Sequence, residues 1–232
     1  MKFSVTILGS NSAIPTIKRN PTAQLVNHNE RLFLIDCAEG TQIQLRKYRI
    51  KIQRISHIFI SHLHGDHFFG LIGLISSMHL LGRNKELHVY GPAKLEEIIQ
   101  IQLEASQTEL VFPFHFHAIG PDSSEKIFEN DRLEIHTIPL NHRIPTNGFL
   151  FKEKQGKRKL KKEVIKDLDI PVEHFSKIKE GADFTDPDGK TYANKELTDD
   201  PPEPRSYAYC SDTSYFEPVI PMVENADLLY HE

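Results

Sequence analysis

One short run of residues constrains this chain more than any other. The apolar pattern of residues 57–60 predicts a buried strand, and three histidines and one aspartate follow within the next seven positions. In an extended segment alternate side chains share a face, so His62 and His64 can reach one metal ion together. Asp66 and His67 stand at the entry to the following helix and can aim at a second point nearby. Histidine nitrogens and a carboxylate suit zinc or a similar divalent cation, so we expect a metal site here.

Two residues farther along the chain can complete a cage for two metal ions. His142 and Asp212 each follow an expected strand, and a carboxylate can bridge two cations because each oxygen can take one. Taken alone, each would more often be a capping or turn residue, and each gains weight only because the first cluster needs partners. We interpret the following histidines as packing or surface residues: His28, His57, His79, His88, His115, His117, His136 and His174.

Strand-like runs alternate with helical patterns through the first two thirds of the chain. The expected strands are 3–8, 31–35, 57–60, 87–90, 111–119, 132–138, 206–210 and 227–230, with one more starting at 148–151. The expected helices are 40–49, 68–81, 93–106 and 216–224. Hairpins occur as well as crossovers, so the pattern predicts an α/β fold with mixed sheets.

The composition changes sharply between residues 152 and 205. A basic stretch is followed by an acidic one, with few large apolar residues between them. Such a segment cannot belong to the main core, so we interpret 152–205 as a protruding arm on a single domain that spans 1–232. A charge run is usually a solvated face, but lysines in this place can neutralise RNA phosphates. The candidate RNA-binding residues are Lys157, Arg158, Lys159, Lys161 and Lys162.

The composition excludes several other classes of protein. Cys37 and Cys210 are the only cysteines, so the chain is not a disulfide scaffold. No apolar run approaches the roughly 18 residues that a membrane span needs, and the N-terminus lacks the apolar block of a signal peptide. We therefore expect a cytoplasmic protein that does not associate with membranes. The net charge of -4 does not by itself indicate nucleic-acid binding.

Taken together, these motifs resemble the metallo-β-lactamase superfamily and, within it, the ribonuclease Z family of tRNA 3′-processing endonucleases. The histidine-rich run, His142 and Asp212 carry the resemblance to the superfamily. Three segments carry the resemblance to the family: the loop 9–20 (GSNSAIPTIKRN), residues 36–42 (DCAEGTQ) and residues 139–148 (PLNHRIPTNG). The similarity covers nearly the whole chain.

The resemblance implies a metallo-β-lactamase-type four-layer αβ/βα sandwich, two zinc ions and a homodimer. By position, His62, His64 and His142 would hold one zinc, Asp66 and His67 the other, and Asp212 would bridge them. The implied reaction is removal of the 3′ trailer from precursor tRNA by metal-activated water, leaving a tRNA 3′-hydroxyl. Asp66 would act as the general base. The arm occupies the place of the family's tRNA-binding exosite.

The sequence also departs from the family pattern. The family's arm commonly carries a Gly-Pro element near its tip, where this chain has residues 170–173 (IPVE). Family members continue past the equivalent of residue 232, through two more histidines, so we expect the second zinc site to be incomplete. Two alternatives therefore stay open. One is a small-molecule phosphodiesterase or arylsulfatase-like hydrolase on the same fold, and the other is a non-catalytic RNA-binding subunit with an incomplete metal site.

Overall fold

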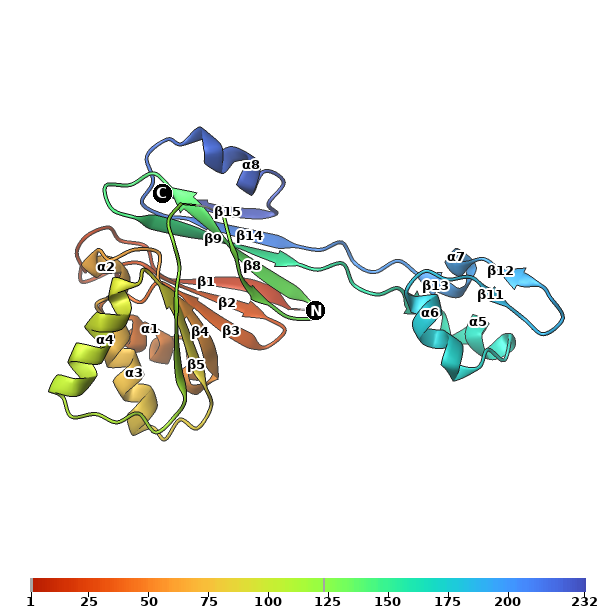
Figure 1. The fold of residues 1–232 in the computed structure, drawn as a ribbon, viewed down its shortest axis with the longest axis horizontal. Helices are drawn as coiled ribbons and strands as arrows, with labels where there is room; N and C mark the ends of the chain where they lie inside the picture. The colour runs from red at the N-terminus through yellow and green to blue at the C-terminus, as the bar shows by residue number, and fades with distance from the viewer. Residues whose placement is uncertain (1, 123) are drawn as a thin grey trace.

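Two β-sheets packed face to face form the body of the molecule, and a long arm projects from it (Figure 1). The computed structural model describes residues 2–122 and 124–232. Within this part of the chain, the first sheet runs β1 (Phe3–Gly9), β2 (Ala23–His28), β3 (Arg31–Ile35), β4 (Ile55–Phe59), β5 (Leu87–Gly91) and β6 (Phe114–Ala118). The second sheet runs β15 (Leu228–His231), β14 (Ser206–Cys210), β9 (Thr146–Glu153), β8 (Leu133–Leu140) and β7 (Lys126–Glu129).

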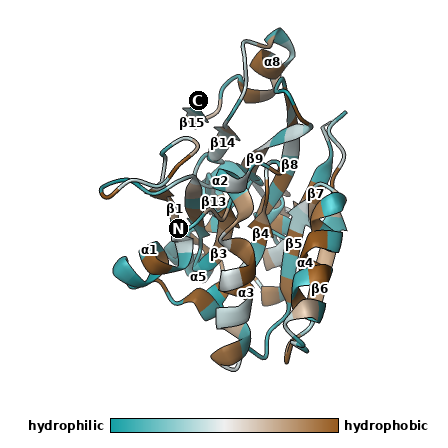
Figure 2. Ribbon diagram, turned by 90° about the vertical axis from the view of Figure 1, so that its left-hand side faces the viewer, coloured by the Kyte–Doolittle hydropathy of each residue, from teal (hydrophilic) through white to brown (hydrophobic). Residues whose placement is uncertain are grey.

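The central strands of the first sheet are apolar on both faces because both faces are buried. In β4, Ile58 points to the outer side of the sheet. It belongs there to a cluster of buried apolar residues, some of which come from the helices α1 (Thr41–Lys47), α3 (Leu71–Leu80) and α4 (Lys94–Ala105). Figure 2 shows hydrophobic stretches, in brown, along α3 and α4. The neighbour of Ile58, Phe59, points to the second sheet, where its ring lies 5.4 Å from that of Phe149. Strands β3 to β6 are parallel, whereas β1 to β3 are antiparallel.

The second sheet buries its outer face under shorter helices. Val219 of the 3₁₀-helix η3 (Glu217–Val219) packs on Ile138 and Ala208, and α8 (Ile220–Val223) follows directly. Helices thus lie outside both sheets. The second sheet is mixed like the first, because β14 and β15 are parallel, whereas β7, β8, β9 and β14 pair antiparallel with their neighbours. This arrangement confirms the predicted α/β sandwich. Among the described residues, no helix is both long enough and apolar enough to cross a membrane.

The arm ends in a small head with a hydrophobic core of its own (Figure 1). Its elements are β10 (Lys159–Leu160), α5 (Lys162–Asp167), η2 (Val172–His174), α6 (Phe175–Lys179), β11 (Phe184–Thr185), β12 (Thr191–Tyr192), α7 (Asn194–Leu197) and β13 (Thr198–Asp199). The buried residues of this core are Ile165, Ile170, Ile178, Phe184 and Leu197. Two extended segments connect the head to the body, one continuing β9 and the other leading into β14.

Several elements differ from the sequence-based prediction. The helix expected over 68–81 consists of α2 (Gly65–Phe68) and α3, with a break at Gly70, where a Cβ atom would lie 2.0 Å from the carbonyl oxygen of Ala38. The strand expected over 111–119 begins only at Phe114. The helix expected over 216–224 is a 3₁₀ turn followed by one α-helical turn, because its two prolines cannot donate backbone hydrogen bonds. Strands β2 and β7 were not predicted.

Candidate metal centre

The candidate centre lies where the first sheet's β4 ends and α2 begins. Residues 60–64 lead from the sheet to α2 with a bend at residues 63 and 64, and His64 has extended dihedral angles (φ -76°, ψ 142°) at the position before α2. The alternation of side chains in this path explains why His62 and His64 approach the same point. His62 and His67 are fully buried, whereas His64 and Asp66 border the solvent-accessible hollow.

Four of the predicted ligands form one compact group. The ligating atoms of His62, His64, His142 and Asp212 all lie within 4.8 Å of one another. Oδ2 of Asp212 is 3.4 Å from Nε2 of His62 and 3.7 Å from Nε2 of His142. Three imidazoles and one carboxylate from three separate segments therefore surround one point, which is the donor set that a divalent zinc-like cation accepts.

The other two predicted ligands lie beside this group, where His67 contacts the carboxylates of both Asp212 and Asp66. Nε2 of His67 lies 3.6 Å from Oδ2 of Asp212 and 3.8 Å from Oδ2 of Asp66. This nitrogen is buried and has no hydrogen-bond partner within the described residues. A buried nitrogen that faces two carboxylate oxygens without a hydrogen bond fits a second cation, because buried polar atoms otherwise find partners. Oδ2 of Asp212 belongs to both groups.

The charges of these residues respond to their contacts. The imidazoles of His62 and His67, whose Nε2 atoms lie 3.4 and 3.6 Å from Oδ2 of Asp212, hold the pKa of Asp212 far below its usual range, so this carboxylate is anionic. Burial opposes protonation of His67, but the carboxylates of Asp36 and Asp212 outweigh it and raise its pKa to about 10. Burial lowers the pKa of His64, as it does for His142, which favours the neutral form that binds metal.

An open hollow of about 440 Å³ exposes the centre to solvent. The loop 12–15 forms one wall, and Phe69 and Arg143 line other parts. The backbone N–H of Ala13 donates to Oδ2 of Asp66 over 2.7 Å, so the loop holds this carboxylate at the edge of the hollow. Arg143 contacts Nε2 of His64 through its Nε atom at 3.1 Å and places a positive charge at the rim.

The structure reveals one buried group beside the centre to which the sequence analysis gave no role. Asp36 is fully buried after β3 and accepts hydrogen bonds from the backbone N–H and the hydroxyl of Ser61. It also contacts His67 and accepts a hydrogen bond from Tyr209. The signal in the sequence was an aspartate that directly follows an apolar strand, a position that requires polar partners inside the fold.

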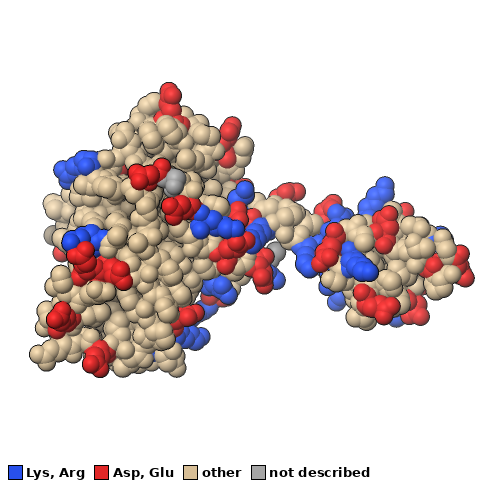
Figure 3. All heavy atoms as spheres, viewed as in Figure 1, with Lys and Arg blue, Asp and Glu red and all other residues tan. Residues whose placement is uncertain are grey.

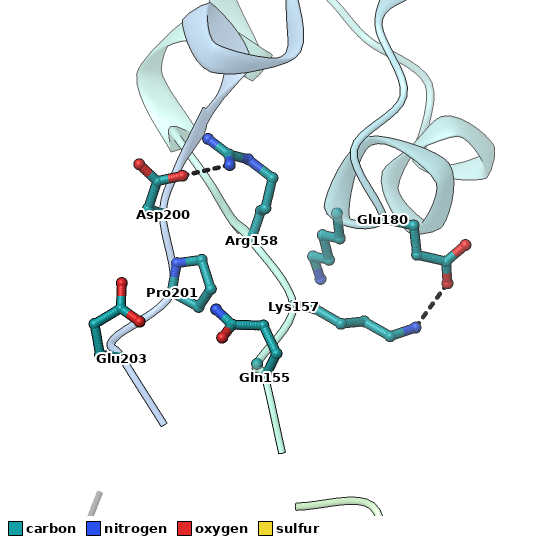
Figure 4. Close-up of a pocket in the computed structure, with 9 residues that line it drawn as sticks. Gln155, Lys157, Arg158, Glu180, Asp200, Pro201 and Glu203 are labelled. Atoms are coloured by element: carbon teal, nitrogen blue, oxygen red, sulfur yellow. Dashed lines mark hydrogen bonds and ion pairs between the residues drawn. The ribbon is translucent and has the colours of Figure 1, made fainter. Parts of the chain in front are cut away.

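The predicted RNA-binding residues lie in the arm, at the base of its head and away from the candidate centre. Lys157 donates to Glu180 over 2.8 Å, and Arg158 pairs with Asp200, as the dashed lines in Figure 4 show. Lys161 donates to a backbone carbonyl over 2.9 Å. Figure 3 shows basic and acidic side chains side by side on the head. The basic stretch of the sequence is therefore interleaved with acidic residues in the fold.

Comparison with known proteins agrees with this geometry. A family model described as "Anti-Pycsar protein Apyc1" matches residues 3–159, a range that contains every predicted ligand except Asp212. Ribonuclease Z of Phocaeicola vulgatus is 48% identical over 231 residues, which cover 100% of this chain and 75% of the relative. The chain belongs to the ribonuclease Z family. Ribonuclease Z of Cytophaga hutchinsonii is 47% identical over 233 residues, which cover 100% of this chain and 74% of the relative.

Solved structures give the same result. The crystal structure of the short form of human tRNase Z matches with a TM-score of 0.68 at 27% identity, covering 97% of this chain and 75% of that one. A metallo-β-lactamase-fold protein of Bacillus subtilis matches with a TM-score of 0.60 at 18% identity, covering 97% and 68%, and so supports the fold alone. The predicted resemblance to the ribonuclease Z family and its metallo-β-lactamase fold is confirmed. A divalent-metal centre agrees with this membership and with the clustered histidine and aspartate side chains.

Proposed function

We propose that this chain is a zinc-dependent endoribonuclease that removes the 3′ trailer from precursor tRNA and leaves a 3′-hydroxyl on the tRNA. Membership of the ribonuclease Z family supports a metal-dependent endoribonuclease that acts on precursor tRNA. The observation that carries the proposal is that His62, His64, His142 and Asp212 form one compact group, and that three of them, His64, His142 and Asp212, line a solvent-accessible hollow. A substrate as large as tRNA requires such an open site.

The described side chains offer four ligands to one cation, whereas a second, incomplete site would have only Asp66, His67 and the shared Asp212. His62, His64 and His142 would hold one zinc ion, Asp66 and His67 would hold the other, and the carboxylate of Asp212 would serve both. Two bound divalent cations would lower the pKa of a water and stabilise the attacking and leaving oxygens of an in-line displacement at phosphorus. The orphaned Nε2 of His67 supports the second assignment.

The remaining steps belong to the chain's own residues. Asp66 would take a proton from the attacking water. Its place at the edge of the hollow and the hydrogen bond from the N–H of Ala13, which orients its carboxylate, support this role. Arg143 can contact a phosphate of the substrate from the rim, where its guanidinium offers several donors. The loop 12–15 borders this space and limits how the RNA enters.

We assign substrate capture to the arm, residues 152–205, inserted into a single domain that spans 1–232. Its projecting position would let it hold a part of the tRNA distant from the cleaved bond (Figure 1). The candidate contacts are Lys157, Arg158, Lys159, Lys161 and Lys162. Binding through phosphates suits a substrate that is recognised by its folded shape. We also propose a homodimer that acts in the cytoplasm.

Cleavage of a 3′-extended precursor tRNA in the presence of Zn²⁺, with both product ends mapped, tests this proposal. Asp66→Ala should abolish cleavage, whereas the matched variant Asp131→Ala, which changes an exposed aspartate in the turn before β8, should cleave normally. A small activated phosphodiester is assayed in parallel. Hydrolysis of that compound without RNA cleavage would favour a small-molecule phosphodiesterase. Failure with both substrates would contradict the proposal.

A further inference from the structure

A row of histidines crosses the first sheet at the end opposite the candidate centre. His57, His88 and His115 are paired across the parallel strands β4, β5 and β6, at the middle of β4 and near the amino ends of β5 and β6. The ring of His88 stacks on that of His57 at 4.9 Å and on that of His115 at 4.9 Å. The proposed function uses none of these residues.

Glu86 directly precedes β5 and faces the outer two rings of this row. Its Oε1 lies 3.6 Å from Nε2 of His88, and its Oε2 lies 3.8 Å from Nε2 of His115. The three ligating atoms all lie within 4.8 Å of one another. Both distances are too long for hydrogen bonds. They are close to the roughly 3.3 Å that separates neighbouring ligand atoms around a tetrahedral ion with bonds of about 2.0 Å.

A second contact orients the central ring. Nδ1 of His88 lies 2.9 Å from Nε2 of His117, so the two rings share one proton between these atoms. When Nδ1 of His88 carries that proton, its Nε2 presents a lone pair toward Glu86. Histidines that bind metal commonly use their other nitrogen in this way, because the second contact fixes the tautomer and the ring plane.

The surroundings tolerate a bound cation. The rings of His57 and His117 pack against that of His88, at centroid distances of 4.9 and 5.2 Å. Arg83 is a cation close to this end of the sheet, but its guanidinium donates to the backbone carbonyls of Lys85 and Glu86. His115 and Glu86 are exposed, so an ion can enter from solvent.

We propose that Glu86, His88 and His115 form an additional metal site, separate from the candidate centre, for a late first-row divalent cation such as Zn²⁺ or Ni²⁺. Two imidazoles and one carboxylate suit these ions, and water would fill the remaining positions. The ion would connect β5 to β6, which is the edge strand of the first sheet. Occupancy would therefore stabilise the fold, because the ion binds the folded chain and not the unfolded one.

Metal counting in the full chain tests this site. After treatment with a chelator, the protein is dialysed to equilibrium against Zn²⁺ and the zinc bound per chain is measured by atomic emission. Glu86→Gln/His115→Ala should bind one equivalent fewer than the unchanged chain. The matched control is Glu173→Gln/His174→Ala, another adjacent glutamate–histidine pair with 3.6 Å between Oε1 and Nε2, and it should bind the full number. Equal zinc content in all three proteins would overturn the proposal.

A second measurement separates the two metal sites. In an Asp212→Ala background, which weakens the candidate centre, Zn²⁺ should still raise the melting temperature. Adding Glu86→Gln/His115→Ala should reduce that rise. If the rise is as large in the combined variant as in Asp212→Ala alone, the ion binds elsewhere and the inference is wrong. Circular dichroism of each variant without Zn²⁺ verifies that it is folded before the comparison is made.

Discussion

Oδ2 of Asp36 lies 2.8 Å from Nδ1 of His67, whose other ring nitrogen faces the carboxylates of Asp66 and Asp212. Asp36 is fully buried and also accepts a hydrogen bond from the hydroxyl of Tyr209 over 2.7 Å. A carboxylate behind a metal-binding histidine fixes its tautomer and makes it a better ligand. We therefore infer that Asp36 positions His67 without touching the substrate.

Asp36→Asn should weaken metal binding at the proposed second site. An amide carries no negative charge, and its single oxygen cannot accept hydrogen bonds from His67, Ser61 and Tyr209 at once. His67 therefore loses its orientation. Removing such an outer partner typically costs 10- to 100-fold in metal affinity or activity, and we expect kcat and zinc affinity to fall together on that scale. Tyr209→Phe removes one of these hydrogen bonds and should have a smaller effect. An Asp36→Asn protein with unchanged zinc affinity would exclude the positioning role.

Asp212→Ala should release more zinc than Asp66→Ala. Asp212 shares one oxygen between both groups of ligands, whereas Asp66 contacts the second group alone. The zinc content per chain, measured by metal analysis after gel filtration, should therefore be highest in the unchanged protein, lower in Asp66→Ala and lowest in Asp212→Ala. Asp131→Ala serves as the exposed control. Equal loss in the two site variants would argue against a shared ligand.

The position of the candidate site could be predicted because its residues occupy the ends of strands. His142 follows β8 and Asp212 follows β14, as the sequence pattern indicates. The hairpin between β2 and β3 was harder to recognise. Its turn uses Asn29 and Glu30, both with positive φ (49° and 68°), and glutamate rarely signals that conformation.

The organisation of the arm could not be predicted from the order of residues alone. The apolar residues of its head lie far apart between Ile165 and Leu197 without a regular period, so no single window reveals a core. The basic and acidic stretches are separate in sequence, but the chain folds back so that Lys157 meets Glu180 and Arg158 meets Asp200. Ion pairing between distant segments depends on the tertiary structure.

This interleaving leads to a prediction about tRNA binding. Replacing all five candidate basic residues with alanine should raise the KM for precursor tRNA and reduce the dependence of binding on salt, by a log–log slope of about one for each phosphate that the arm no longer neutralises. Hydrolysis of a small activated phosphodiester should not change. Conversely, Glu180→Gln/Asp200→Asn should tighten binding at low salt, because it frees Lys157 and Arg158. If neither variant alters the KM, the arm does not bind tRNA through these charges.

The contacts at the foot of the arm, where β9 ends and the arm begins, should make the stability of the fold depend on acidic pH. Glu153, at the end of β9, is almost fully buried and accepts hydrogen bonds from the backbone and the guanidinium of Arg205 at 2.8–2.9 Å, and it also pairs with His28.

Burial opposes ionisation of Glu153, but the contacts with Arg205 outweigh it and lower the pKa from 4.5 to about 2. A carboxyl group whose pKa is lower in the folded state adds stability above its unfolded pKa and loses it as the pH falls. The melting temperature of the unchanged protein should therefore exceed that of Glu153→Gln at pH 7, and the difference should shrink between about pH 4.5 and pH 2. Glu109→Gln, at an exposed site, should follow the unchanged protein throughout. A difference that stays constant over this pH range would show that packing, and not the charge of Glu153, stabilises the foot of the arm.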